Sequence, residues 1–179
     1  DPVFSKVDVY LSYCDERNFQ LKYTVDTHIH ADHITGSGVL KKQRNCEYII
    51  HEMANVECAM KGVKDSNEYR FGEYTLKVLF TPGHTDHHIA LLVEDRVFTG
   101  DCLFINGCGR TDFQSGSEEE QWHSIFQILY GLPDDVLVYP GHDYNKHRVS
   151  SIIQEKETNR RTVGHTKESF IQQMKELDL

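Results

Sequence analysis

Seven histidine and aspartate side chains fall into four short motifs whose spacing suits a metal ion. Residues 27–33 read THIHADH and place four candidate ligands within six positions. Three further candidates each follow a glycine: His84 and His142 in Pro-Gly-His turns, and Asp101 in a Thr-Gly-Asp turn. Imidazole nitrogens and carboxylate oxygens are common ligands of zinc and non-haem iron. A single histidine after a strand is usually a capping or core residue, but a cluster of this density predicts a metal site.

The four candidate ligands of the first motif are His28, His30, Asp32 and His33. The six other histidines lack such spacing, and we predict that they are structural or exposed. They are His51, His87, His88, His123, His147 and His165.

Each motif follows a segment that the sequence predicts to be a β-strand. Residues 21–26 precede the first motif, and residues 74–80 alternate apolar with polar side chains ahead of the second, as in a half-buried strand. Strands are also predicted over 96–99 and 136–139, ahead of the last two motifs. Loops at the edge of a rigid sheet commonly carry catalytic groups. We therefore expect these four loops to carry the site.

Helices and further strands are predicted between these segments. The predicted helices span 36–43, 118–130, 146–158 and 167–177, and two more strands span 47–51 and 88–93. Strands in series with interspersed helices favour layered sheets with helices outside, an α/β architecture. A length of 179 residues suits one domain over residues 1–179.

Composition excludes several classes of function. The net charge of −9 and the lack of a basic stripe argue against a nucleic-acid partner, because such partners are bound by basic surfaces. No apolar run is long enough for a membrane span. The five cysteines are irregularly spaced and include no CxxC, so they predict a reduced, intracellular protein and not a disulfide framework.

The order HxHxDH, GH, GD and GH over residues 21–145 resembles the metallo-β-lactamase superfamily. The resemblance implies an αβ/βα sandwich with the metal site at one edge, between two sheets. Members usually begin with extra strands before an Asp-Pro-like turn. Asp1-Pro2 already stands at that turn, so we expect the first N-terminal strands to be missing.

Residues 107–114, which read GCGRTDFQ, resemble the persulfide dioxygenases. The segments DHITGS at 32–37 and HDY at 142–144 fit the same family. The resemblance implies an oxidoreductase of sulfide detoxification that converts glutathione persulfide and O₂ into sulfite and glutathione. It implies one Fe(II) per chain, held by His28, His84 and Asp101. Members are mitochondrial in eukaryotes and cytoplasmic in bacteria, and homodimers occur.

The same resemblance suggests roles for the other polar groups near the motifs. Arg110 is the candidate for binding a glutathione carboxylate, with an ion pair to Asp112 as the alternative. Thr111 is a further candidate for substrate binding. Tyr144 is a candidate catalytic residue that also contacts substrate, or it closes a local turn. Cys108 is interpreted as a buried small side chain. The groups expected to orient the three ligands are His30, Asp32, His33 and His142.

Two alternatives remain open. In a dinuclear hydrolase, such as a glyoxalase II-like hydroxyacylglutathione thioesterase, all seven side chains would hold two Zn(II) or mixed ions. One ion would take His28, His30 and His84, the other would take Asp32, His33 and His142, and Asp101 would bridge them. Against this reading, glyoxalase II typically has aromatic residues and Glu after the GCGR-like turn. The last alternative is a catalytically silent metal-binding domain, which has no reason to keep the full ligand set.

Overall fold

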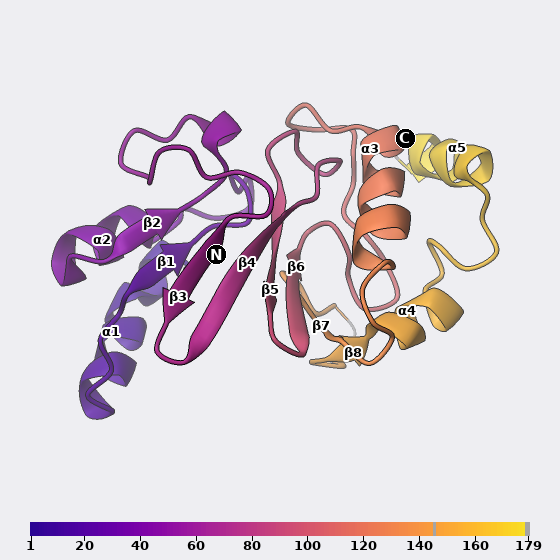
Figure 1. Cartoon of the computed structure of the whole chain (residues 1–179). Helices are drawn as coiled ribbons and strands as arrows, with labels where there is room; N and C mark the ends of the chain where they lie inside the picture. The colour runs from indigo at the N-terminus through magenta and orange to yellow at the C-terminus, as the bar shows by residue number, and fades with distance from the viewer. Residues whose placement is uncertain (145, 178–179) are drawn as a thin grey trace. The chain divides into compact units, whose positions relative to one another are not determined.

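Two segments of the chain, Asp1–Lys64 and Asp65–Leu179, form separate units in the computed structural model. The structure describes residues 1–144 and 146–177. The first unit is the indigo to violet part of Figure 1, and the second runs from magenta to yellow. The prediction of one domain over residues 1–179 stays a prediction.

The first unit is built on two parallel strands joined by a helix. Its elements are η1 (Phe4–Lys6), α1 (Val7–Glu16), β1 (Tyr23–Val25), α2 (Ser37–Arg44), β2 (Glu47–Ile49) and η2 (Glu52–Ala54). Thr24 of β1 lies opposite Tyr48 of β2, and α2 provides the crossover that parallel strands need. The two longer helices bury a small core of Val7, Leu11, Leu40 and Cys46. The loop between β1 and α2 carries the THIHADH motif.

The second unit is a six-stranded sheet with helices. Its elements are β3 (Glu68–Phe71), β4 (Tyr74–Phe80), β5 (Ile89–Val93), β6 (Arg96–Gly100), α3 (Glu118–His123), the π-helix η3 (Ser124–Leu129), β7 (Leu137–Pro140), β8 (Ser150–Ser151), α4 (Ile152–Thr158) and α5 (Lys167–Leu177). The strand order is the sequence order, β3 to β8. Among the described strands of this sheet, the β6–β7 pair is parallel and the other neighbouring pairs are antiparallel.

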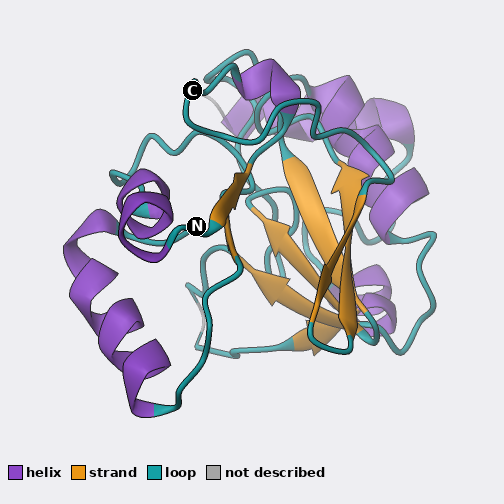
Figure 2. Ribbon diagram, turned by 60° about the vertical axis from the view of Figure 1, so that its left-hand side comes forward, coloured by secondary structure: helices purple, strands orange, loops and turns teal. Residues whose placement is uncertain are grey.

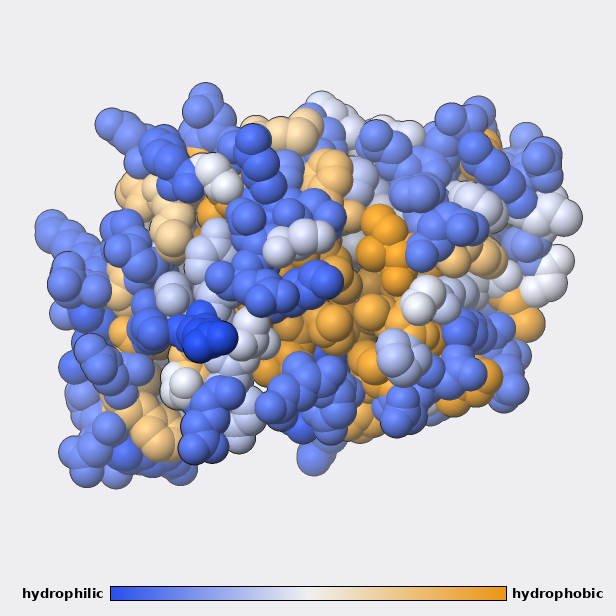
Figure 3. Space-filling view, in the orientation of Figure 1, coloured by the Kyte–Doolittle hydropathy of each residue, from blue (hydrophilic) through white to orange (hydrophobic). Residues whose placement is uncertain are grey.

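One continuous core joins the sheet to the helices of the second unit. Figure 2 shows the ribbons of these strands and helices. Ala90, Val97 and Val138 of the sheet meet Ile125 of η3 and Phe170 of α5 in this core. In the space-filling view, apolar side chains gather over the middle of this unit and hydrophilic ones surround them (Figure 3). The buried apolar area fixes the sheet as a rigid base for its loops.

Strand direction brings three loops to one edge of this sheet. β5 is antiparallel to both β4 and β6, and β7 is parallel to β6. The three strands β4, β6 and β7 therefore run in the same direction and end at the same edge. The residues that follow them include His84, Asp101 and His142, as the sequence predicted.

Most predicted elements are present, with shifted ends, but the predicted helix over 146–158 is wrong in its first half. Residues 150–151 pair with β7 instead, and the helix begins at Ile152, where the Ser151 hydroxyl caps it by accepting the N–H of Gln154. Helix α1 and strand β3 were not predicted. Among the described residues, no helix has the length and apolar character of a membrane span.

Candidate metal centre

His84 presents one ring nitrogen towards Asp101. The Nδ1–H of His84 donates to the carbonyl of Arg110 at 2.8 Å. A carbonyl can only accept, so this bond fixes the tautomer and leaves Nε2 as the ligand atom. Nε2 lies 3.8 Å from Oδ2 of Asp101. Two donors that each stand about 2.1 Å from one ion are at most about 4.2 Å apart, so this pair fits a shared metal.

His142 approaches the same carboxylate. Its Nε2 lies 3.6 Å from Asp101 Oδ2, so two imidazoles face one oxygen. Its ring stacks on Tyr144, with centroids 5.5 Å apart and planes at 21°. The second unit thus brings together three of the seven predicted ligands.

Two glycines allow the backbone to come close to this carboxylate. A Cβ on Gly141 would lie 2.6 Å from Asp101 Oδ1, and one on Gly109 would lie 2.2 Å from the Asp101 carbonyl oxygen. The N–H of Gly109 donates to that same carbonyl at 2.9 Å. Any side chain at either position would displace a ligand-bearing segment.

The other four predicted ligands lie together in the first unit. The rings of His28 and His30 have centroids 4.1 Å apart, and those of His30 and His33 have centroids 4.2 Å apart. The Asp32 carboxylate lies 3.2 Å from His33 Nδ1 and 3.8 Å from His30 Nδ1. Ligand atoms of His30, Asp32 and His33 lie within 4.8 Å of one another. His28 is buried, and its Nδ1 lies 3.0 Å from the Thr27 hydroxyl.

A buried carboxylate, Asp26, supports this histidine cluster. It accepts hydrogen bonds from the hydroxyls of Tyr48 at 2.7 Å and Thr35 at 2.8 Å, and one oxygen lies 3.7 Å from His30 Nε2. Burial acts to raise the pKa of Asp26, but the His30 contact, the N-terminal amine and the two hydroxyls together hold it below its usual value. The ionised group can therefore orient the His30 ring.

Comparisons with known proteins identify the family. The Metallo-beta-lactamase superfamily model matches residues 11–142. The chain is 37% identical over 182 residues to a protein of Homo sapiens named "Persulfide dioxygenase ETHE1, mitochondrial", covering 100% of this chain and 71% of that protein. It belongs to the persulfide dioxygenase family of this superfamily.

Two further relatives show the fold and the range of the superfamily. The crystal structure of ETHE1 from Myxococcus xanthus matches with a TM-score of 0.95 and 44% identity, over 100% of this chain and 79% of that one. A "Hydroxyacylglutathione hydrolase" of Rhizobium johnstonii is 37% identical over 138 residues, 75% of this chain and 53% of that protein. The predicted metallo-β-lactamase fold is confirmed.

In this persulfide dioxygenase family member, a cavity of about 400 Å³ opens beside His84 and Asp101. We call it the arginine cavity, because Arg110 and Arg161 both line it. Its remaining lining residues are Phe104, Asn106, Gly107, Cys108, Gly109 and Tyr144. A space of this size, with two guanidinium groups, suits a small anionic molecule.

The residues predicted to bind substrate are placed differently from one another. Arg110 pairs with Asp112, which was the alternative interpretation, and its side chain is 63% exposed at the cavity. Tyr144 lines the cavity, is 74% exposed and makes an edge-on contact with Phe104. Thr111 is buried and is not among the lining residues, so its predicted role in substrate binding stays a prediction.

Cys108 is half-buried and lines the arginine cavity, so it is less buried than its interpretation as a buried small side chain supposed. Its Sγ lies 3.7 Å from the sulfur of Met174. Burial raises the pKa of the Cys108 thiol to about 12, although Arg161 and a hydrogen bond with Gln121 act to lower it. The thiol is therefore protonated at neutral pH and is a poor nucleophile.

Two residues beside the family's motifs were missed from the sequence. Arg161 lies in the C-terminal part of the chain, and no motif linked it to the cavity. His88 fits the structural part of its prediction, since it is fully buried and its Nε2 accepts the backbone N–H of Asp101 at 3.1 Å, but its link to Asp101 was not predicted. The sequence does contain a signal for His88, since it follows the Pro-Gly-His turn by only four residues.

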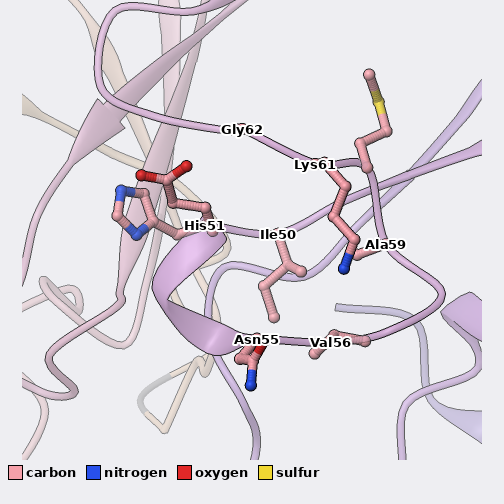
Figure 4. A pocket seen from close by; sticks show the side chains of 9 residues that line it. Ile50, His51, Asn55, Val56, Ala59, Lys61 and Gly62 are labelled. Atoms are coloured by element: carbon pink, nitrogen blue, oxygen red, sulfur yellow. The ribbon is translucent and has the colours of Figure 1, made fainter.

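A further cavity of the first unit has no predicted ligand among its lining residues (Figure 4). It measures about 230 Å³. Figure 4 shows Ile50 and Lys61 reaching into the space between two chain segments, with Asn55 on its far side. His51 borders it, and its Nδ1 accepts the N–H of Met53 at 3.4 Å, which fits the structural role predicted for it.

Proposed function

We propose that this chain is an iron-dependent persulfide dioxygenase that oxidises glutathione persulfide to sulfite and glutathione. One O₂ and one water enter, the S–S bond breaks, and the terminal sulfur carries three oxygens away as sulfite. The observation that carries the proposal is the arginine cavity beside the His84–Asp101 pair, in a chain of the persulfide dioxygenase family.

The ligand set that we propose is His28, His84 and Asp101. Two imidazoles and one carboxylate form the facial triad of non-haem iron oxygenases. When bound, ferrous iron supplies the redox chemistry and leaves positions for persulfide and dioxygen. The geometry that supports a metal here is the 3.8 Å separation of His84 Nε2 and Asp101 Oδ2, with the His84 tautomer fixed by Arg110.

The arginine cavity would bind the glutathione part of the substrate. A planar guanidinium matches a carboxylate with two hydrogen bonds, and glutathione has two carboxylates. Arg161 is half-buried at the cavity, whereas Arg110 would have to exchange its Asp112 partner. Holding both ends of the tripeptide fixes the persulfide beside the ligand pair, which removes much of the entropic cost of the reaction.

Tyr144 would donate its phenol O–H to the substrate. Its position at the rim, stacked on His142, supports this role. The remaining candidates, His30, Asp32, His33 and His142, would orient the three ligands and raise their basicity. Homodimer formation and the mitochondrial or cytoplasmic location stay predictions.

One observation favours a dinuclear hydrolase as the second candidate. Both His84 Nε2 and His142 Nε2 lie within 3.8 Å of the same oxygen of Asp101, as expected where one carboxylate bridges two ions. A hydrolase of this kind would cleave the thioester of a hydroxyacylglutathione with two Zn(II) or mixed metals. Relatives named hydroxyacylglutathione hydrolase support it.

Metal content and substrate preference separate the candidates. The full chain is purified without oxygen, its metals are counted, and O₂ uptake with glutathione persulfide is compared with hydrolysis of S-lactoylglutathione. About one iron per chain and O₂ uptake with sulfite release support the proposal. Two ions with thioester hydrolysis support the hydrolase, and failure of the iron-loaded chain to consume O₂ overturns the dioxygenase.

Arg161 and its neighbour Arg160 provide a matched control for the cavity. Arg161→Met removes a charge that lines the cavity, whereas Arg160→Met removes an exposed charge that does not line it. We expect the first change to raise KM for glutathione persulfide by about 10-fold or more, as for a lost charge-assisted hydrogen bond. The second should leave KM within about 2-fold of the wild type.

A further inference from the structure

His88 is a fully buried imidazole that joins two ligand-bearing loops of the second unit. It stands immediately before β5, and none of its surface is exposed. On one side its Nδ1 lies 2.9 Å from the Thr81 hydroxyl, and on the other its Nε2 lies 3.1 Å from the backbone nitrogen of Asp101. Thr81 begins the turn that carries His84.

The contact with the Asp101 backbone determines which ring nitrogen of His88 carries the proton. The peptide N–H of Asp101 can only donate, so Nε2 of His88 carries no proton and accepts. The neutral imidazole therefore has its proton on Nδ1 and donates it to the Thr81 hydroxyl. A second link from the same residue holds the turn, since the Thr81 N–H donates to the His88 carbonyl at 3.0 Å.

The segment that His88 contacts lies at the end of β6, where the regular strand pairing stops. β6 ends at Gly100, which has a left-handed φ of 49°, and the β6–β7 register shifts between Phe98 and Gly100. The Asp101 N–H therefore lies beyond the regular strand pairing. With that N–H bonded to His88 and the Asp101 carbonyl bonded to Gly109 at 2.9 Å, both flanks of the residue are fixed and the carboxylate retains mainly its side-chain rotations.

We propose that His88 is a positioning residue that fixes the Asp101 carboxylate in its metal-binding orientation and ties it to the His84 turn. A histidine that only filled space could be replaced by an apolar side chain. His88 instead places its unprotonated Nε2 against the backbone N–H of the proposed ligand Asp101. The inference rests on the proposed function, because it takes Asp101 as a ligand.

Two amide variants separate the two nitrogens of the ring. In His88→Gln, the longer side chain can place its carbonyl oxygen where Nε2 stands and accept the Asp101 N–H. In His88→Asn, the shorter side chain can reach only the Nδ1 position and keeps the Thr81 contact alone. His87→Asn is the control, because His87 is a neighbouring buried histidine whose Nδ1 lies 2.7 Å from the Asp86 carboxylate.

The readout is binding of Co(II) alone to the full-length protein, with no substrate and no oxygen. We expect His88→Asn to weaken Co(II) binding by about 10–100-fold, as for loss of groups that orient metal ligands, and to shift the visible Co(II) absorption bands. His88→Gln and the control should stay within about 3-fold of the wild type. Thermal unfolding of each metal-free variant shows that it is folded.

The proposal is overturned if His88→Asn binds Co(II) as tightly as the wild type, or if His88→Gln is weakened as much as His88→Asn. The proposed function fails separately. If the Co(II) affinities of the variants are as expected but the iron-loaded wild type consumes no O₂, the positioning role of His88 stands and the proposed dioxygenase activity is overturned. If the wild type binds no Co(II), the metal site itself is ruled out, and both proposals are overturned.

Discussion

The two units hold their candidate ligands by different means. In the first unit, four candidates come from one loop, residues 28–33, and they are held by side chains. The Asp26 carboxylate, itself bonded to Tyr48 and Thr35, lies beside His30, and Asp32 lies beside both His30 and His33. The arrangement depends on local contacts.

In the second unit, His84, Asp101 and His142 come from three strand ends up to 58 residues apart in sequence, and contacts to the main chain fix His84 and Asp101. The Arg110 carbonyl fixes the His84 ring, and the Asp101 peptide is bonded on both flanks. The positions of these candidate ligands in the second unit therefore depend on the strand pairing of the sheet. From this comparison we expect the ligands of the second unit to be the more sensitive to a shift of the main chain.

The largest expected effect comes from removing a proposed ligand, Asp101, and a smaller one comes from removing a group that orients the ligands, His30. Asp101→Ala should weaken Fe(II) or Co(II) binding by more than about 100-fold, beyond the range for groups that only orient ligands, and His30→Ala by about 10-fold. The measurement is metal titration of the anaerobic protein, followed by O₂ uptake with glutathione persulfide. If His30→Ala instead removes one of two bound ions, His30 is itself a ligand and the dinuclear alternative gains.

A main-chain shift in the second unit should have the next largest effect. Gly141→Ala puts a Cβ within 2.6 Å of Asp101 Oδ1, whereas a Cβ on Gly107 meets only an ordinary contact, 3.9 Å from the Cβ of Phe104. We expect Gly141→Ala to lower metal affinity by about 10–100-fold and Gly107→Ala to leave it nearly unchanged. Equal affinities in the two variants, by the same titration, would show that the carboxylate has room to move.

The sequence predicts the parts of this molecule that local pattern encodes. Strand β4 was predicted with its observed ends, because apolar and polar side chains alternate along it. The THIHADH loop was predicted because its ligands are neighbours in sequence. The three other ligands were predicted from their glycine turns, and the parallel direction of β6 and β7 explains why they meet.

What was not predicted depends on contacts that pattern does not encode. Strand β3, Glu68–Phe71, alternates exposed with half-buried side chains, but it is an edge strand of only four residues and its register comes from β4. The start of the helix at Ile152 depends on the pairing of Ser150 with β7. The role of His88 depends on a backbone N–H of Asp101, 13 residues away, and a motif of side-chain types cannot show such a donor.

The smallest expected effect again contrasts the two units, through one cysteine of each. Cys58 is an exposed free thiol of the first unit, whereas Cys108 has a pKa raised by burial to about 12. The raised pKa keeps the Cys108 thiol protonated at pH 8, so alkylation of Cys108 should be slower than that of Cys58. Mass spectrometry after iodoacetamide treatment measures both sites, and urea-unfolded protein, in which every cysteine reacts, is the control.

The raised pKa of Cys108 means that the folded state holds the thiol proton more tightly than the unfolded state does. The contribution of Cys108 to stability is therefore present below about pH 9 and is lost as the pH rises towards 12. Cys108→Ala should leave O₂ uptake within about 2-fold of the wild type, because a protonated thiol supplies no nucleophile. A larger loss of activity, or rapid alkylation of Cys108 in the folded protein, contradicts this interpretation and gives the thiol a role in the arginine cavity.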